Sequence, residues 1–358
     1  MPHRVIQWGT GNVGKFALAG ILDHPDLELV AVVVHSPTKA GLDAAELAGD
    51  GRGPTGIVAT TDTDTALATA ADCVCYTATA DLRPFEAIND LCRILESGTN
   101  VVSSSVVPLC YPPAAEPSMV ERLGEACRRG QSSFFTSGID PGFANDVLPL
   151  LLTGISRRID RIRVQEILNY DTYDQPTVLF GTMGFGKPMD HLPLLLVPGA
   201  LRFAWGPIVA AIAAGLDADL DEIREEYERW EAPQRYDTAA GPIEKGTMAA
   251  LRFEVQGIID GEPRIVVEHV TRMHDDAAPH WPRANNPQGG YRITIDGEPS
   301  IAVDLEITAP NGDHNDGGLI VTAQRIINAI PHVVAAPPGL CNALDLGLIT
   351  GRHLLTTG

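Results

Sequence analysis

The stretch that decides the fold is VIQWGTGNVGKFALAGIL, residues 5–22, near the start of the chain. An apolar run gives way to three glycines, Gly9, Gly11 and Gly14, and apolar residues then resume at helical spacing. Gly-x-Gly-x-x-Gly between a strand and a helix predicts a loop that binds a dinucleotide. The first glycine allows a tight turn, the second lets a pyrophosphate approach the backbone, and the third lets the helix pack closely. The alternative is a glycine-rich turn without a ligand.

The phosphates are expected to meet the free N–H groups and the positive end of the helix that follows the loop. The residues predicted to contact the nucleotide lie in this loop and at the ends of neighbouring strands. They are Gly9, Thr10, Gly11, Asn12, Val13, Gly14, Thr77, Thr79 and Ser103.

The end of the second strand indicates which dinucleotide is bound. NAD sites usually place Asp or Glu there, about 20 residues after the loop, to bind the ribose 2′-hydroxyl. This chain has VVVHSPTKAG at 32–41, with His35, Ser36, Thr38 and Lys39 and no carboxylate. Hydroxyls, an imidazole and an ammonium group suit a 2′-phosphate. The stretch therefore predicts NADP, with NAD possible, and a solvated polar loop is the alternative interpretation.

Short β-rich runs alternate with helical ones over the first part of the chain. Strands are expected at 4–9, 27–35, 73–79, 100–105 and 133–140, and helices at 12–23, at 84–97 and from Pro141 onward. The run LELVAVVVH, residues 27–35, is almost continuously apolar, as in a strand buried on both faces. This order predicts an α/β Rossmann domain, a doubly wound parallel sheet, over residues 1–150.

Beyond Gly154 the pattern changes to alternating polar and apolar residues. Residues 252–274 and 291–308 each contain a DGEP turn, at 260–263 and 296–299, which predicts two β-hairpins. We expect a second α+β domain with an antiparallel sheet over residues 151–324, for substrate binding and dimerisation. Residues 325–358 are expected to return to the first domain.

Composition excludes several classes of partner. Lys and Arg number 26 against 46 Asp and Glu, a formal charge of −20 that would repel nucleic acid. Six cysteines without a CxxC pair indicate reduced thiols and a cytoplasmic protein. Prolines at 193, 198 and 207 interrupt the apolar segment 192–216. We therefore expect short buried helices or a subunit contact there, and no membrane partner.

Three segments carry a family resemblance: SGIDPGFANDVLPLLLTG (137–154), GTMGFGKP (181–188) and TAQRIINAIPHVVAAPPGL (322–340). With the glycine loop, they resemble dihydrodipicolinate-reductase-like oxidoreductases, which include 2,4-diaminopentanoate dehydrogenase and the native amine dehydrogenases. The resemblance implies a homodimer that interconverts a small amine with a ketone or aldehyde plus ammonia, using NAD(P). The paired histidines of true dihydrodipicolinate reductases are absent from the sequence.

The chain departs from this family where a catalytic group is expected. Native amine dehydrogenases carry a glutamate in the loop after the fifth strand, before a Tyr-Pro pair. Here Tyr111 and Pro112 remain, but VVP at 106–108 replaces the acid, and the usual Asn-Pro-Gly-Phe is DPGF at 140–143. Either the carboxylate has moved or the reaction differs.

Asp140 and Glu166 are the candidate catalytic carboxylates. Reductive amination passes through an iminium cation, which a buried carboxylate stabilises and whose protons it can shuttle. Asp140 ends a predicted Rossmann strand, where ligands of doubly wound sheets bind. It also fits a helix N-cap before Pro141. Glu166 lies on a predicted strand of the second domain, with a surface carboxylate as the alternative.

Aromatic, sulfur and amide side chains of the second domain are the candidate substrate pocket, with core packing as the alternative for each. They are Phe143, Asn169, Tyr170, Tyr173, Met183 and Phe185. His269, His274 and His314 lack an HExxH motif or cysteine partners, so no metal is expected. We predict an NADP-dependent oxidoreductase acting on a C–N bond. The alternatives are an NADP-dependent carbonyl or hydroxy-acid reductase and a non-catalytic NADP-binding protein.

Overall fold

The computed structural model describes residues 1–80 and 83–355, which divide into two compact units. The first comprises Met1–Ile139 and Leu319–Gly358, and the second Asp140–Gly318. Both divisions fall earlier than the expected positions at 150 and 325. The helix at Val147–Thr153 explains the first difference, because it packs against elements of the second unit. Residues 356–358 of the expected returning segment lie outside the described residues.

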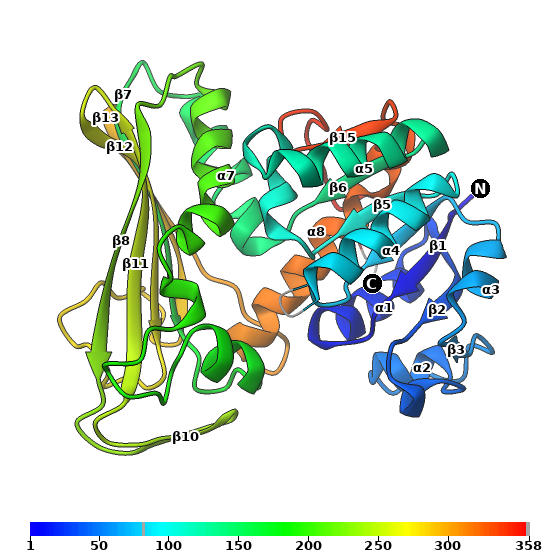
Figure 1. Cartoon of the computed structure of the whole chain (residues 1–358), viewed down its shortest axis with the longest axis horizontal. Helices are drawn as coiled ribbons and strands as arrows, with labels where there is room; N and C mark the ends of the chain where they lie inside the picture. Colours follow the sequence, from blue (N-terminus) through cyan, green and yellow to red (C-terminus); the bar gives the residue numbers. More distant parts are fainter. Residues whose placement is uncertain (81–82, 356–358) are drawn as a thin grey trace. The chain divides into compact units, whose positions relative to one another are not determined.

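The first unit is built on a seven-stranded parallel sheet of order β15-β6-β5-β4-β1-β2-β3 (Figure 1). The strands are β1 (His3–Trp8), β2 (Leu27–Val33), β3 (Ala59–Thr60), β4 (Cys73–Tyr76), β5 (Asn100–Ser103), β6 (Ser133–Thr136) and β15 (Gly339–Cys341). The helices are α1 (Asn12–Asp23), α2 (Ala44–Ala48), α3 (Thr63–Ala68), α4 (Pro84–Glu96), α5 (Pro117–Gly130) and α8 (His314–Ala335), of which α8 begins in the second unit. This confirms the predicted doubly wound parallel sheet.

Helices cover both faces of this sheet, because each contributes an apolar stripe to one of two clusters. On one face, Leu18 and Ile21 of α1 pack with Ile326 and Ile330 of α8. On the other, α4 and α5 bury apolar residues that include Leu91. All six cysteines are free and buried, and burial raises the thiol pKa of Cys75 above its usual range.

The second unit contains a six-stranded sheet of order β14-β13-β7-β12-β11-β8. Its strands are β7 (Arg158–Asn169), β8 (Glu222–Glu231), β11 (Met248–Ile259), β12 (Glu262–Arg272), β13 (Gly289–Glu298) and β14 (Ile301–Leu305), with a separate pair β9 (Tyr236–Thr238) and β10 (Gly241–Ile243). The hairpins β11–β12 and β13–β14 confirm both predicted DGEP turns. One pair, β7 with β12, is parallel, so the sheet is mixed rather than antiparallel throughout.

Helix α6 (Val147–Thr153) begins six residues later than expected, after an irregular segment. The expectation of a helix from Pro141 was wrong: the backbone of Asp140 is extended (φ −153°, ψ 114°), and Gly142 has a φ of 145°. Asp146 caps α6 by accepting a hydrogen bond from the Val147 N–H. Asp140 is therefore not a helix N-cap, and its carboxylate is available for another role.

The apolar segment 192–216 forms a short turn, η6 (Leu194–Leu196), and helix α7 (Ala200–Gly215). The remaining short helical turns are η1 (Pro37–Lys39), η2 (Val107–Cys110), η3 (Pro112–Ala114), η4 (Ile139–Phe143) and η5 (Thr177–Thr182). Pro207 does not end α7, contrary to expectation. The missing backbone bond is tolerated because α7 packs against β8, β11 and β12, with Ile208 and Val209 fully buried.

Among the described helices, α8 is long and apolar enough to cross a membrane by length and composition alone. Core helices of soluble proteins pass the same test. Ala323, Ile326, Ile327 and Ile330 of α8 are fully buried in the first unit, as in such a core helix.

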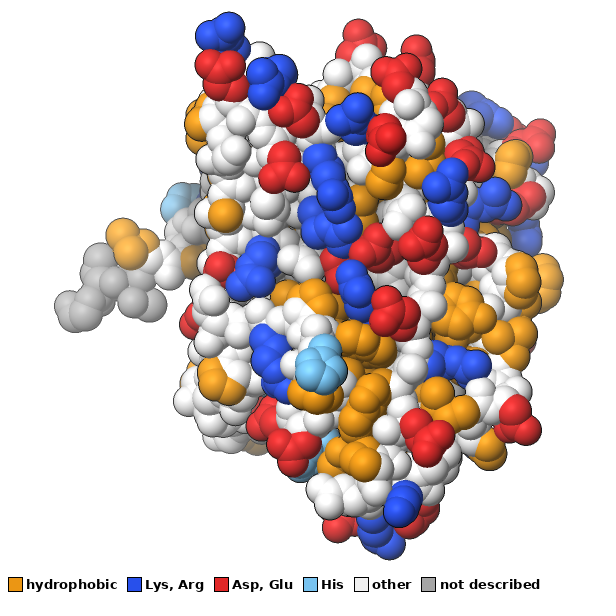
Figure 2. All heavy atoms as spheres, turned by 90° about the vertical axis from the view of Figure 1, so that its left-hand side faces the viewer, with side chains coloured by type: hydrophobic (Ala, Val, Ile, Leu, Met, Phe, Trp, Pro, Cys, Tyr) orange, Lys and Arg blue, Asp and Glu red, His pale blue; other side chains and the backbone are white. Residues whose placement is uncertain are grey.

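The face of the six-stranded sheet that carries Glu268 holds interleaved charges of both signs. The buried Glu268 forms ion pairs with Arg163 and Arg252, and Arg163 also bridges Glu254 at 2.7 Å. Figure 2 shows Lys, Arg, Asp and Glu side chains interspersed with apolar ones on the side of the molecule it presents. Because successive strand residues face opposite sides, His269 lies on the other face from Glu268.

We predict that Gly14→Ala destabilises the protein while Gly11→Ala does not. A Cβ at Gly14 would collide with the Gly9 carbonyl oxygen and lie 2.8 Å from Thr77 Oγ1, whereas a Cβ at Gly11 meets nothing within 4 Å. The overpacked variant should lose about 1–3 kcal/mol of unfolding free energy. Urea unfolding of both variants measures this. Equal midpoints for the two would contradict the packing argument.

Candidate active site

In the glycine loop, the backbone is free of close neighbours at Gly11, whereas it is closely packed at Gly9 and Gly14. Gly9 has a φ of 94°, and a Cβ there would lie 2.8 Å from the Ala78 nitrogen. Gly11 is exposed, precedes the first residue of α1 and has no side-chain cap. The N-terminal N–H groups of a helix lack internal partners, so an anion can bind at this point. These features match a cradle for a pyrophosphate.

A cationic group lies against this loop. The Lys39 Nζ donates hydrogen bonds to the Thr10 carbonyl oxygen at 2.7 Å and to Thr10 Oγ1 at 3.3 Å. Nearby in sequence, the hydroxyls of Ser36 and Thr38 are 2.8 Å apart.

A second cationic side chain, Arg83, lies at His35 and was not predicted from the sequence. Its Nη1 donates to His35 Nδ1 at 3.4 Å, 48 residues away along the chain. The sequence feature that could have indicated Arg83 is its position between β4, the strand that pairs with β1, and helix α4. His35, Lys39 and Arg83 thus supply side chains suited to a phosphate.

Two of the residues predicted to contact the nucleotide form hydrogen bonds with the protein backbone. Thr77 is buried, and its hydroxyl donates to the Gly9 carbonyl oxygen at 2.9 Å, which fixes the loop. Ser103 is fully buried and its Oγ accepts the Ser105 N–H at 2.9 Å. Thr79 is exposed, and Asn12 and Val13 are half-buried at the start of α1.

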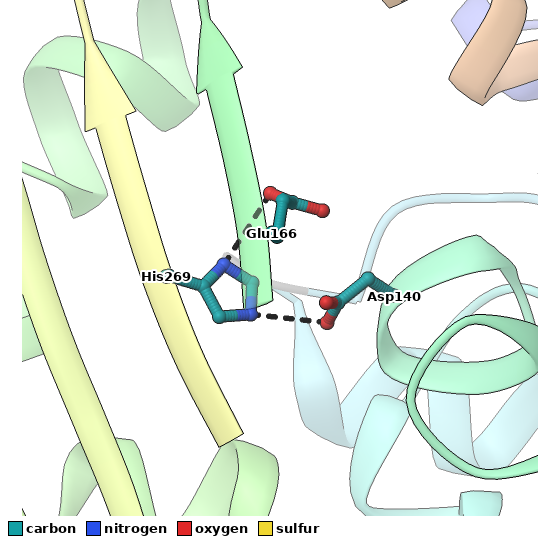
Figure 3. Close-up of side chains that lie close together, drawn as sticks. All are labelled: Asp140, Glu166 and His269. Atoms are coloured by element: carbon teal, nitrogen blue, oxygen red, sulfur yellow. Dashed lines mark hydrogen bonds and ion pairs between the residues drawn. The ribbon is translucent and has the colours of Figure 1, made fainter. Parts of the chain in front are cut away.

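The second unit brings Asp140, Glu166 and His269 together (Figure 3). His269 Nε2 lies 3.1 Å from Asp140 Oδ1, and His269 Nδ1 lies 3.3 Å from Glu166 Oε1. All three side chains are at most 6% exposed. The two predicted carboxylates therefore meet through one histidine.

This cluster is built along a single row across the mixed sheet. Glu166 on β7 is paired in register with His269 on β12 and with Tyr291 on β13, and His269 is paired with Phe253 on β11. Directly paired residues on neighbouring strands project from the same face. The parallel β7–β12 pair therefore sets the contact between Glu166 and the imidazole.

Aromatic side chains enclose the histidine and orient the aspartate. The His269 ring is stacked on Phe253 with centroids 4.6 Å apart, and the Trp205 ring meets its edge at 4.7 Å. Trp205 Nε1 also donates to Asp140 Oδ1 at 2.9 Å. Trp205 and His269 both form their hydrogen bonds with Oδ1 of Asp140.

The surroundings make His269 a cation at neutral pH. Burial by itself lowers the pKa of His269, but the charges of Asp140 and Glu166 outweigh it and raise the pKa to about 10. Tyr170 donates to Glu166 Oε1 at 2.9 Å, and burial followed by the Glu166 charge raises the pKa of Tyr170 and Tyr291 well above the usual range. Two carboxylates and one imidazolium leave an excess of one buried negative charge.

The same three residues place potential metal ligands within 4.8 Å of one another. However, His269 presents each ring nitrogen to a different carboxylate, so both nitrogens act as donors. An imidazolium has no lone pair left for a metal. The donor set therefore fits a hydrogen-bonded ion cluster better than a metal centre.

Of the six residues predicted to line the substrate pocket, two lie at the buried cluster and four are described by other contacts or by their burial. Tyr170 and Tyr173 lie at the cluster, with ring centroids 5.0 Å apart. Asn169 forms structural hydrogen bonds: its side-chain amide donates to Asp275 Oδ1, and its backbone carbonyl oxygen accepts from His314 Nε2.

Phe143 is half-buried, while Met183 and Phe185 are 8% and 0% exposed. From the sequence, His269 was considered only as a metal ligand, and Trp205 and Tyr291 were not predicted as site residues. The one signal for Tyr291 was its position at the start of a predicted hairpin.

The loop after β5 offers no acid within residues 104–110. Leu109 and Cys110 are buried, and Val106 adopts a left-handed backbone (φ 58°) that is rare for a β-branched residue. The only acids in the buried cluster described above come from Asp140 and Glu166.

Comparisons with known proteins agree on one family. Residues 143–353 match the family of 2,4-diaminopentanoate dehydrogenase C-terminal domains. The chain is 44% identical to an amine dehydrogenase of Streptomyces virginiae over 345 residues, covering 96% of each chain. It is 25% identical to a 2,4-diaminopentanoate dehydrogenase of Acetoanaerobium sticklandii, covering 73% of this chain and 70% of that one. The solved structure of an amine dehydrogenase from Mycobacterium smegmatis shares the fold, with a TM-score of 0.79 at 22% identity, covering 98% and 97% of the two chains.

Proposed function

The chain belongs to the family of 2,4-diaminopentanoate dehydrogenases and amine dehydrogenases, and on that premise we propose that it reductively aminates a small ketone or aldehyde with ammonia. It is an oxidoreductase that acts on a C–N bond with a nicotinamide cofactor. Hydride transfer to an iminium cation gives the amine, and the reverse reaction oxidises the amine.

The buried Asp140–His269–Glu166 cluster is the observation that supports this proposal. Its excess negative charge favours a cation over a neutral carbonyl, because electrostatic interactions strengthen where water is excluded. An iminium is cationic, whereas the ketone from which it forms is neutral. The cluster thus supplies the carboxylate that the loop after β5 lacks.

Each residue has a distinct role in this mechanism. The Asp140 carboxylate stabilises the iminium and accepts a proton as ammonia adds to the carbonyl. His269 holds both carboxylates in place, and Trp205 fixes the Asp140 rotamer through its 2.9 Å hydrogen bond. Tyr170 donates to Glu166, so that carboxylate remains an acceptor next to the site.

NADP is the nucleotide we propose, and the first unit supplies residues that fit it. When bound, the nicotinamide provides the hydride. Gly11 would let the pyrophosphate approach the start of α1, because its Cβ position is open. Lys39 and Arg83 would bind the 2′-phosphate, and a carboxylate is absent from residues 32–41.

The proposed activity is tested by following NADPH oxidation with a panel of small ketones and aldehydes, with and without ammonium. Consumption only in the presence of ammonium, with the amine identified by mass spectrometry, is the expected result. Equal consumption without ammonium identifies a carbonyl reductase instead. Thermal stabilisation by NADPH without turnover identifies a non-catalytic nucleotide-binding protein.

We predict that Lys39→Ala weakens NADPH binding by about ten- to a hundredfold and NADH binding by less than threefold. The estimate follows from about 1.5–3 kcal/mol for a hydrogen bond to a charged group. Calorimetric titration with both nucleotides measures the change, and Arg93→Gln is the matched control, since Arg93 lies in α4 and pairs with Asp64. An equal loss of affinity for NADPH and NADH would show that Lys39 does not bind the 2′-phosphate.

A further inference from the structure

A cavity of about 490 Å³ lies at the end of the mixed sheet, apart from the residues of the proposed active site. It is formed by the start of β7, the turn between β11 and β12, and the residues just after α7. Its lining residues are Ser156, Arg157, Arg158, Ile159, Asp160, Arg161, Ile162, Leu216, Ala218, Ile259, Asp260, Arg264 and Ile265. Such a volume is typical of sites for small organic ligands.

Positive charge dominates this cavity, although the whole chain carries −20. Four arginines line it against two aspartates. Arg158 pairs with Asp160 at 3.0 Å, and Arg157 pairs with Glu298 at 3.2 Å, but the side chains of Arg157 and Arg158 are 82% and 62% exposed. Exposed pairs of this kind are weak, so a stronger anionic ligand can compete for the guanidinium groups.

Two lining residues carry buried donor atoms that lack an acceptor in the described part of the chain. They are Ser156 Oγ and Arg161 Nε. Asp296 lies opposite Arg161 in the β7–β13 register, yet it forms no described ion pair with it. Buried donors without an acceptor are rare in folded proteins, so these two atoms single out this end of the sheet.

The helix end that borders the cavity disfavours an anion only weakly. The last carbonyl groups of α7 accept hydrogen bonds from the N–H groups of Leu216, Asp217 and Ala218. Their partial negative charge is thereby partly satisfied within the chain. Ile162, Leu216 and Ile265 add an apolar portion to the lining.

From these observations we propose that this cavity binds a small organic anion, with its charged end on the arginines and Ser156 and its apolar body against the isoleucines and Leu216. The lining has four arginines and two aspartates, and Glu298, which pairs with Arg157, leaves one positive charge in excess, which favours an anion. This site is separate from the proposed reaction and stands without it.

Calorimetric titration with phenyl phosphate at constant ionic strength tests the proposal, with inorganic phosphate as the comparison. We expect saturable binding, at least tenfold tighter for phenyl phosphate because only it reaches the apolar lining. Arg161→Gln and Ser156→Ala should each weaken binding, Arg161→Gln by tenfold or more. Circular dichroism and urea unfolding verify that both variants are folded, and Arg161→Lys retains the charge if Arg161→Gln is unstable.

The Lys39→Ala variant distinguishes binding in this cavity from binding at the nucleotide loop, because that loop also attracts phosphates. Binding unchanged in Lys39→Ala and lost in Arg161→Gln places the ligand in the arginine-lined cavity. Loss in Lys39→Ala with retention in Arg161→Gln, or no saturable binding at all, overturns the proposal. Failure of the ammonium assay leaves these outcomes unaffected.

Discussion

Asp140→Asn is expected to lower kcat for reductive amination by about a hundredfold or more, while the Kd for NADPH changes less than twofold. A neutral amide removes the negative charge that stabilises the iminium and the group that accepts a proton, and such contributions are about 10²- to 10⁴-fold. The amide preserves the shape and the acceptor for Trp205. NADPH affinity is expected to be retained because Asp140 is not one of the residues predicted to contact the nucleotide.

Steady-state kinetics with saturating ammonium, together with calorimetry for NADPH, measures both quantities. Asp237→Asn is the matched control, since the Asp237 side chain is 81% exposed and pairs with Arg235. It should keep full turnover. Turnover within threefold of wild type in Asp140→Asn would remove Asp140 from the mechanism, and Glu166→Gln would then identify whether the other carboxylate acts alone.

His269→Gln is expected to destabilise the protein by about 3–5 kcal/mol at pH 7, because it leaves two buried carboxylates without their cation. The pKa of His269 is raised from 6.5 to about 10 in the folded protein. A raised pKa stabilises the fold fully below the unfolded value, and this contribution is lost as the pH rises through about 10. Wild-type stability should therefore fall from pH 7 toward pH 10, and the variant should show a shallower fall.

Urea unfolding at intervals between pH 6 and pH 9.5 measures this slope. Tyr170 and Tyr291 do not interfere in that range, since unfolded tyrosine titrates near pH 10 and the folded pKa of both lies higher. His280→Gln, at an exposed position, is the control and should follow wild type. Parallel curves for wild type and His269→Gln would show that His269 does not carry the buried charge.

The sequence predicted elements whose signal is local. The glycine spacing at 9–14 predicted the loop and helix α1, and short β-rich runs predicted five of the seven strands of the first sheet, whereas the short strands β3 and β15 were not predicted. Both DGEP turns predicted their hairpins, because a turn and its flanking strands are close in the chain. Glu166 and Asp140 were found as single acids, each with a structural alternative that the sequence left open.

The tertiary structure alone decided how distant residues meet. His269 lies 129 residues from Asp140, and its contact with Glu166 depends on the register and parallel direction of β7 and β12. Arg83 reaches His35 only because the chain segments that carry them come together in the fold. The sequence by itself determined the glycine loop, the two-domain plan and the hairpins, because periodicity and turn chemistry act between near neighbours. Strand pairing and burial are properties of the folded chain, and they determined the charge of His269 and the assembly of the cluster.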